Sequence, residues 1–278
     1  MVNDVLLWSR RNQLTIHPVK TEAMLIRKSP FVGPLPPLYF GCDFIQTVES
    51  STCLAINLDN KLSWSNHTFY VKKNFMNKVG ALKRMKYLPV KTLAEIYFKT
   101  IIPSVTYGIL CWGNCSTTLL SHLDTVHSRA ARIIYSLDSS LSDAECLLTS
   151  NWPPISYFYK KCVLLFMHKV YFDSLSFPLG AFVSKNASGR SLRAVNHMII
   201  PRPNSEVGRN TLRYRGPVIW NFVNKIAKVP ESLASFKITI RKSHVELNAF
   251  SFNKEAVVIT KKFKRFYLLL ISRILHFS

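Results

Sequence analysis

The sequence predicts a mostly helical α+β fold, in which a small β segment precedes an antiparallel helical bundle and a less regular, basic C-terminal region. Hydrophobic residues make up 48% of the 278 residues, an ordinary share for a folded chain. Strand-like segments occur near the N-terminus, and from residue 63 onward apolar residues recur at helical spacing. These observations divide the chain into predicted regions 1–62, 63–175 and 176–278.

The first region is predicted to begin with a helix and to continue as strands. Asp4 is a suitable N-cap for a helix over residues 4–12, because its side chain can accept a hydrogen bond from a backbone N–H of the first turn. Residues 23–27 and 54–58 have strand character. In the second of these strands, alternation places Leu54, Ile56 and Leu58 on one side of the pleat.

The second region is predicted to consist of helices. Ser63 or Ser65 can cap a helix that Pro89 ends. Its apolar stripe comprises Val71, Phe75, Val79, Leu82 and Met85. The other side carries Lys72, Lys73, Lys83 and Arg84. Further helices are predicted over residues 90–102, 117–135 and 155–172, the first of them ending at Pro103, and their short connections favour antiparallel packing.

Positive charge is the strongest feature of the composition. The chain has 37 Lys and Arg against 15 Asp and Glu, a formal net charge of +22. Residues 61–113 hold nine basic residues against one acidic, and residues 181–278 hold eighteen against four. We expect a chain this basic to bind a polyanion, either a nucleic acid or an anionic membrane surface.

The C-terminal region contains a second basic segment, and a helix is predicted over residues 217–227. Arg209, Arg213 and Arg215 are interleaved with aromatic residues up to Trp220. This mixture suits contacts with backbone phosphates and stacking on bases. The alternative is a surface turn whose aromatic side chains fill the core. The tail 261–267 could contact phosphates or lie on an anionic membrane.

No metal site and no enzyme motif is predicted. His122 and Asp124 have the H-x-D spacing of iron ligands, but residues two apart on a helix point away from each other. Cys111 and Cys115 lack a second pair that would complete a zinc site. The sequence has no G-x-x-x-x-G-K-[ST], G-x-G-x-x-G or G-x-S-x-G. Residue chemistry alone therefore favours a binding protein.

The expected location is intracellular, in the nucleus or the cytoplasm. The longest apolar run, residues 101–113, has 13 residues, whereas a bilayer span needs roughly 20. The amino terminus also lacks the layout of a secretory signal, so secretion and a transmembrane segment are not expected.

Several motifs follow one another in a specific order. They are Trp8-x3-Asn12-x-Leu14-x-Ile16-x3-Lys20-Thr21, Leu54-Ala55-Ile56-x-Leu58-Asp59-x2-Leu62-x-Trp64-x2-His67, Tyr107-Gly108-x3-Trp112-Gly113 and Arg129-x2-Arg132-Ile133. In order and spacing they resemble the C-terminal part of the reverse transcriptases of non-LTR retrotransposons, of the LINE type and jockey-like.

This resemblance implies a role for each region. Residues 1–62 would be the end of the polymerase palm, with a primer-grip hairpin at 53–59. Residues 63–175 would be the helical thumb, whose basic helix follows the template–primer backbone, and residues 176–278 the basic C-terminal region. Lys20 would match the lysine that protonates the pyrophosphate leaving group. Ala55 stands where the family has Gly, so the turn there is expected to be strained or reshaped.

The family's paired aspartates, which hold two Mg²⁺ ions, have no counterpart, because the sequence contains no Asp-Asp. The chain alone is therefore expected to be inactive as an RNA-directed DNA polymerase and to hold no cofactor. The predicted function is sequence-independent binding of RNA/DNA or RNA duplexes through their phosphates. One alternative is a stand-alone or decayed nucleic-acid-binding module without an enzymatic role. A further alternative, ranked below it, is a basic peripheral membrane protein. No protein partner is predicted.

Overall fold

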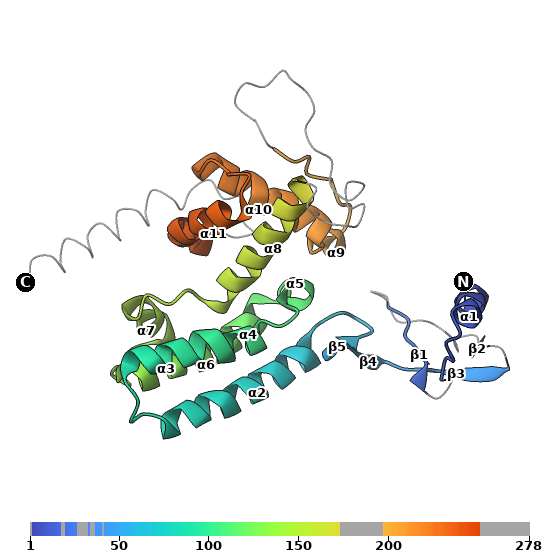
Figure 1. The fold of residues 1–278 in the computed structure, drawn as a ribbon, viewed down its shortest axis with the longest axis horizontal. Helices are drawn as coiled ribbons and strands as arrows, with labels where there is room; N and C mark the ends of the chain where they lie inside the picture. Colours follow the sequence, from blue (N-terminus) through green and yellow to red (C-terminus); the bar gives the residue numbers. More distant parts are fainter. Residues whose placement is uncertain are drawn as a thin grey trace, which may run out of the picture. The chain divides into compact units, whose positions relative to one another are not determined.

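A computed structural model describes residues 2–17, 20–26, 33, 37–40, 42–172 and 197–250 (Figure 1). About 60% of these residues are helical and 9% lie in strands, which confirms the α+β, mostly α class. The chain divides into two compact units, Met1–Lys78 and Val79–Ser278. The division falls within one helix, α2 (Ser65–Arg84), later than the predicted region boundary at 62/63. The basic tail 261–267 lies outside the described residues.

Before α2, the first unit contains the helix α1 and two small sheets. Helix α1 (Val2–Arg11) is followed by β1 (Glu22–Ala23), β2 (Leu38–Phe40) and β3 (Asp43–Thr47). Strand β3 is central, parallel to β1 and antiparallel to β2. Its side chains alternate, since Ile45 is buried whereas Phe44 is exposed on the other face.

The second sheet is a hairpin of β4 (Ser50–Cys53) and β5 (Ile56–Asp59). Leu54 and Ala55 form its two-residue turn, with φ of 48° and 62°. The prediction that Leu54 belongs to the strand is therefore wrong. Both turn residues adopt the left-handed conformation that a type I′ turn requires, and neither is the Gly or Asn that tolerates it best.

Asp59 joins the hairpin to the start of α2. Its carboxylate accepts hydrogen bonds from the backbone N–H groups of Lys61 (3.0 Å), Ser63 (3.0 Å) and Trp64 (3.1 Å). The Ser63 hydroxyl donates a fourth bond, of 3.2 Å. Partial burial raises the pKa of Asp59, but these hydrogen bonds outweigh it and leave the pKa below its usual value.

A continuous helical segment follows α2 and passes through a proline. It comprises α3 (Val90–Ile96), a π-helical turn (Tyr97–Ile101) and α4 (Ile102–Val105). The predicted end at Pro103 is therefore wrong. Proline lacks the N–H of the α-helical ladder, and here it stands in the first turn of α4, directly after the wider π-turn, where that N–H is not needed.

The longest helices match the sequence periodicity. After α5 (Ile109–Trp112) come α6 (Thr117–Tyr135) and α8 (Ile155–Tyr171), close to the predicted 117–135 and 155–172. Between them lies α7 (Asp143–Thr149), which was not predicted. It begins with a capping box in which Ser142 and Glu145 satisfy each other's backbone N–H groups.

Four helices form the C-terminal part of the described chain. They are α9 (Glu206–Arg209), α10 (Leu212–Ile226), α11 (Leu233–Lys242) and α12 (His244–Ala249), and α10, α11 and α12 all contact α8 (Figure 1). Helix α10 begins at Leu212 and contains Pro217, so the predicted start at Pro217 is wrong. Gly216 permits the close approach of α10 to α8, because a Cβ there would collide with Met167.

No helix in the described part of the chain is both long and apolar enough to span a bilayer.

Candidate nucleic-acid interface

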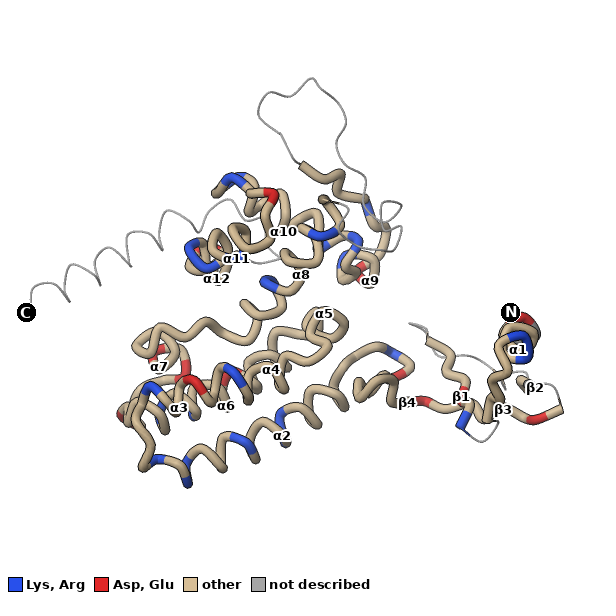
Figure 2. Tube along the Cα trace, in the orientation of Figure 1, with Lys and Arg blue, Asp and Glu red and all other residues tan. Residues whose placement is uncertain are grey.

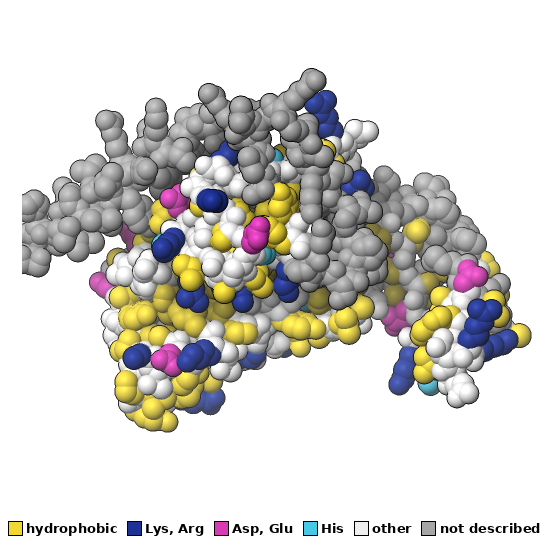
Figure 3. Space-filling model, turned by 45° about the horizontal axis from the view of Figure 1, so that its top comes forward, with side chains coloured by type: hydrophobic (Ala, Val, Ile, Leu, Met, Phe, Trp, Pro, Cys, Tyr) yellow, Lys and Arg dark blue, Asp and Glu magenta, His cyan; other side chains and the backbone are white. Residues whose placement is uncertain are grey.

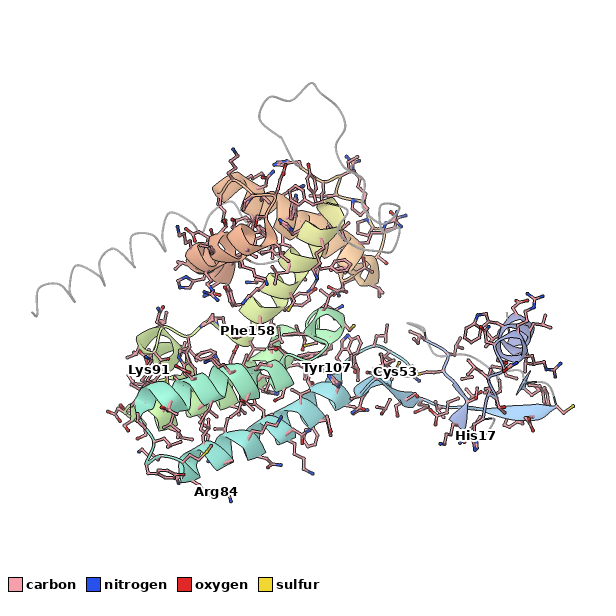
Figure 4. The ribbon with its side chains drawn as sticks, viewed as in Figure 1. His17, Cys53, Arg84, Lys91, Tyr107 and Phe158 are labelled. Atoms are coloured by element: carbon pink, nitrogen blue, oxygen red, sulfur yellow. The ribbon has the colours of Figure 1, made fainter. Side chains whose placement is uncertain are left out.

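Helix α2 presents basic side chains on its exposed face. Lys73, Lys83 and Arg84 are exposed, and Lys72 is half-buried at the edge of the same face. Figure 2 shows the Lys and Arg positions distributed along this helix, and Figure 4 places Arg84 at its C-terminal end. At about 100° per residue, the three exposed cations fall within an arc of about 100°. All four side chains that the sequence assigned to one face therefore share one helix surface.

The opposite side of α2 is buried. Phe75, Val79 and Leu82 are at most 1% exposed. This agrees with the predicted apolar stripe. The burial fixes the rotation of the helix about its own axis. The face that carries the cations is therefore the exposed one.

Apolar side chains interrupt the cations. Phe69 is 71% exposed and Met76 is 44% exposed, and both fall within the arc of Lys73, Lys83 and Arg84. These two residues were not predicted to lie there, although the same helical spacing that places the lysines also places them. The face is therefore mixed rather than purely basic.

No carboxylate of the described residues forms an ion pair with this face. Helix α2 contains no Asp or Glu. Among the described residues, the ion pairs are Lys99 with Glu95 and Arg132 with Asp143, and neither pair includes a cation of α2. Lysine and arginine side chains that are exposed and unpaired can exchange their counterions for phosphates of a polyanion.

The second predicted basic segment is only partly at the surface. Arg209 and Arg213 are exposed. Arg215 is 8% exposed, its Nη2 donates a 2.5 Å hydrogen bond to Asn210 Oδ1, and it also bonds the Tyr159 side chain. The expectation that Arg215 contacts nucleic acid is therefore wrong. Residues two apart on a helix point in different directions, and position 215 is on the side of α10 that faces α8.

A further basic cluster joins two helices. Lys161 on α8 lies near Lys237 and Arg241 on α11, since both cations lower its pKa, although burial lowers it more. This cluster was not predicted, because Lys161 is remote in sequence from the other two residues. The spacing of Lys237 and Arg241, four residues apart on one helix, was the available signal.

The motif between Leu54 and His67 forms a compact local structure. Asp59 caps the following turn, Trp64 is buried, and the Asn57 N–H donates a 3.3 Å hydrogen bond to His67 Nδ1. Comparisons with the known protein families, with curated proteins and with solved structures find no match. Within this chain, the motif spacing reflects how the hairpin is attached to α2.

No metal site accompanies the predicted catalytic lysine among the residues that the structure describes. Lys20 is exposed, and its backbone N–H donates a 3.1 Å bond to the carbonyl of His17. Among the described residues, no group of three or more His, Cys, Asp or Glu side chains is placed to hold a metal ion. The residues present therefore do not fit the two Mg²⁺ ions that the resemblance implies for a complete polymerase.

On the face of the molecule drawn in Figure 3, Lys and Arg side chains are more frequent than Asp and Glu side chains and lie among apolar ones. The buried His127 forms two hydrogen bonds. Tyr97 Oη hydrogen-bonds His127 Nδ1, and His127 Nε2 lies 3.0 Å from the carbonyl of Pro153. Burial lowers the pKa of His127 to about 4, so the imidazole is neutral and serves as a structural link.

Proposed function

We propose that the chain binds RNA/DNA hybrids and RNA duplexes through their phosphates, as a thumb-containing fragment related to non-LTR reverse transcriptases. The observation that supports this most is the unpaired set of Lys73, Lys83 and Arg84 on the exposed face of α2. Phosphate contacts of this kind provide affinity without reading base sequence.

The length of the face fits several contacts. From Lys73 to Arg84 the helix rises by about 16 Å, at 1.5 Å per residue. Three to four phosphate contacts would give a fall in affinity of roughly 40- to 150-fold between 50 and 200 mM salt, from the slope expected for counterion release. Phe69 and Met76 would add apolar contacts beside the sugars.

The deciding experiment measures the binding of a labelled RNA/DNA hybrid by fluorescence anisotropy. The double variant Lys73→Glu/Arg84→Glu should weaken binding by at least about tenfold and flatten the salt dependence. The matched control is Lys225→Glu/Lys228→Glu, which makes the same charge change at exposed positions in and after the last turn of α10. Equal losses in the two variants would mean that net charge alone governs binding and would contradict the assignment to α2.

A second comparison locates the contact. Lys237→Glu/Arg241→Glu removes the cluster on α11 without changing α2. If this variant loses more hybrid binding than the α2 variant, the main contact is at α11 and the proposal for α2 is wrong.

Membrane binding is tested with the same variants. The exposed Phe69 and Met76 beside lysines would also suit an anionic lipid surface. Flotation with vesicles with and without phosphatidylserine should show weaker binding than that of the hybrid at equal ionic strength. Tight vesicle binding that is lost in the α2 variant, together with unchanged hybrid binding, would overturn the nucleic-acid proposal.

No polymerase activity is proposed for the chain alone. Lys20 could act only beside a metal-bound triphosphate, and the described residues include no cluster of three or more His, Cys, Asp or Glu that could hold the metal. Primer extension with Mg²⁺ on a primed RNA template is therefore expected to give no product.

A further inference from the structure

The second unit contains a cavity of about 530 Å³ that the proposed function does not use. Helices α6, α7 and α12 line it, together with residues 151–154. Its walls are largely apolar and include Leu147, Leu148, Trp152 and Val245. The volume lies in the range typical of sites for small organic molecules, which are usually apolar with a few placed polar groups.

Asp124 provides an anionic group in this cavity wall. Its Oδ1 accepts a 2.7 Å hydrogen bond from the backbone N–H of Ile155. In the part of the chain that the structure describes, no Lys or Arg forms an ion pair with this carboxylate. Burial raises the pKa of Asp124 to about 6, and the nearby Asp143 adds to the rise.

The other carboxylate of the cavity is already compensated. Asp143 Oδ1 lies 3.1 Å from Arg132 Nη1 and 2.5 Å from the Ser128 hydroxyl. Burial alone would raise its pKa, but these partners hold the pKa below its usual value. The uncompensated negative charge of the cavity is therefore that of Asp124.

A second polar group at the wall lacks a donor. Asn248, on α12, also lines the cavity, and its Oδ1 is buried without a hydrogen-bond partner among the described residues. A buried acceptor that makes no hydrogen bond costs about 1–3 kcal/mol, so a donor from a ligand would be favourable. His244 also lines the cavity, and its Nδ1 lies 3.1 Å from the carbonyl oxygen of Arg241.

We propose that this cavity binds a small organic ammonium ion with an aromatic or aliphatic body. The ammonium group would pair with Asp124 and donate to Asn248, while the body would contact Leu147, Trp152 and Val245. A positively charged ligand is otherwise unfavourable for a chain of net charge +22, so non-specific attraction cannot produce a preference for cations. The site lies on α6, α7 and α12, so its test does not depend on duplex binding at α2.

The test compares tryptamine with tryptophol, which has a hydroxyl in place of the amine, by calorimetric titration of the full chain. Tryptamine is expected to bind with a dissociation constant of about 0.1–1 mM, consistent with its size. Tryptophol should bind at least about tenfold more weakly, because it lacks the charge that pairs with Asp124. Equal binding of both compounds, or no saturable binding of tryptamine, would overturn the proposal.

Two variants test whether the ligand binds in this cavity. Asp124→Asn retains an oxygen that can accept the Ile155 N–H, so the fold is expected to persist, and the preference for the amine should disappear. Ala144→Trp fills the cavity from α7, where Ala144 is exposed, and should weaken both compounds. An amine preference that survives in Asp124→Asn would show that the cation binds elsewhere.

Discussion

Lys160, in the first half of α8, donates hydrogen bonds from Nζ to the carbonyl oxygens of Leu247 (2.6 Å) and Phe250 (2.7 Å) at the end of α12. The last carbonyls of a helix have no partner within the helix and carry partial negative charge, which a cation satisfies. The ammonium group is buried, and this burial lowers its pKa to about 8. The bond therefore attaches the end of the described chain to its central helix.

Lys160→Met should destabilise the second unit by about 2–3 kcal/mol, because buried carbonyls would lose their donor. Urea unfolding followed by tryptophan fluorescence measures the change. Lys161→Met is the matched control: its ammonium lies among Lys237 and Arg241, so its removal should be neutral or stabilising. Equal destabilisation by both changes would show that the hydrogen bonds of Lys160 are not responsible.

Asp124 should make the stability of the second unit depend on pH. Its folded pKa of about 6 is above the usual value of 3.8. The folded state therefore binds more protons between these values, and stability falls as the pH rises through 6. Asp124→Asn should be more stable than the parent by about 1–3 kcal/mol at pH 8, and the advantage should vanish near pH 4. An advantage independent of pH would contradict this account.

Two glycines should respond to alanine in opposite ways. Gly216→Ala places a methyl group against Met167 and should destabilise the α8–α10 contact by about 1–3 kcal/mol. Gly80 lies on the exposed face of α2 with no neighbouring atom within 4 Å, so Gly80→Ala should raise helix stability by about 1 kcal/mol. Thermal unfolding of the two variants checks both signs.

The hairpin turn should be improved by one substitution. Ala55 has φ of 62°, and the left-handed conformation costs an L-residue roughly 1–2 kcal/mol that glycine avoids. Ala55→Gly should therefore slow amide hydrogen exchange across β4 and β5 by about fivefold or more. Ser51→Gly, within β4, is the control and should speed the exchange.

The sequence was sufficient for long, strongly periodic helices. Helix α6 was predicted with the observed bounds, and α8 nearly so, because many apolar residues in each recur at helical spacing. Short helices such as α7 and α12 were missed, since a few residues carry little periodicity. Prolines were overread as helix boundaries: Pro103 was predicted to end a helix and stands where α4 begins, and Pro217 was predicted to start one and lies within α10.

The site was partly predictable for the same reason. The cations of α2 share one helix, so spacing alone relates them. Arg215 was misjudged because its partner Tyr159 is on another helix and far away in sequence. The cavity at Asp124 was also out of reach, since α6 and α12 meet only in the folded chain. Sequence spacing predicts which residues share a face of a helix or strand. Whether that face is exposed depends on tertiary contacts.

The four hydrogen bonds of Asp59 have a mechanical consequence. They restrain the backbone of the five-residue link between the hairpin and the helix. We therefore expect β5 and the first turns of α2 to move together. Protonation of this single carboxylate at strongly acidic pH would weaken these hydrogen bonds. The orientation of the first turns of α2 would then no longer be fixed relative to the hairpin.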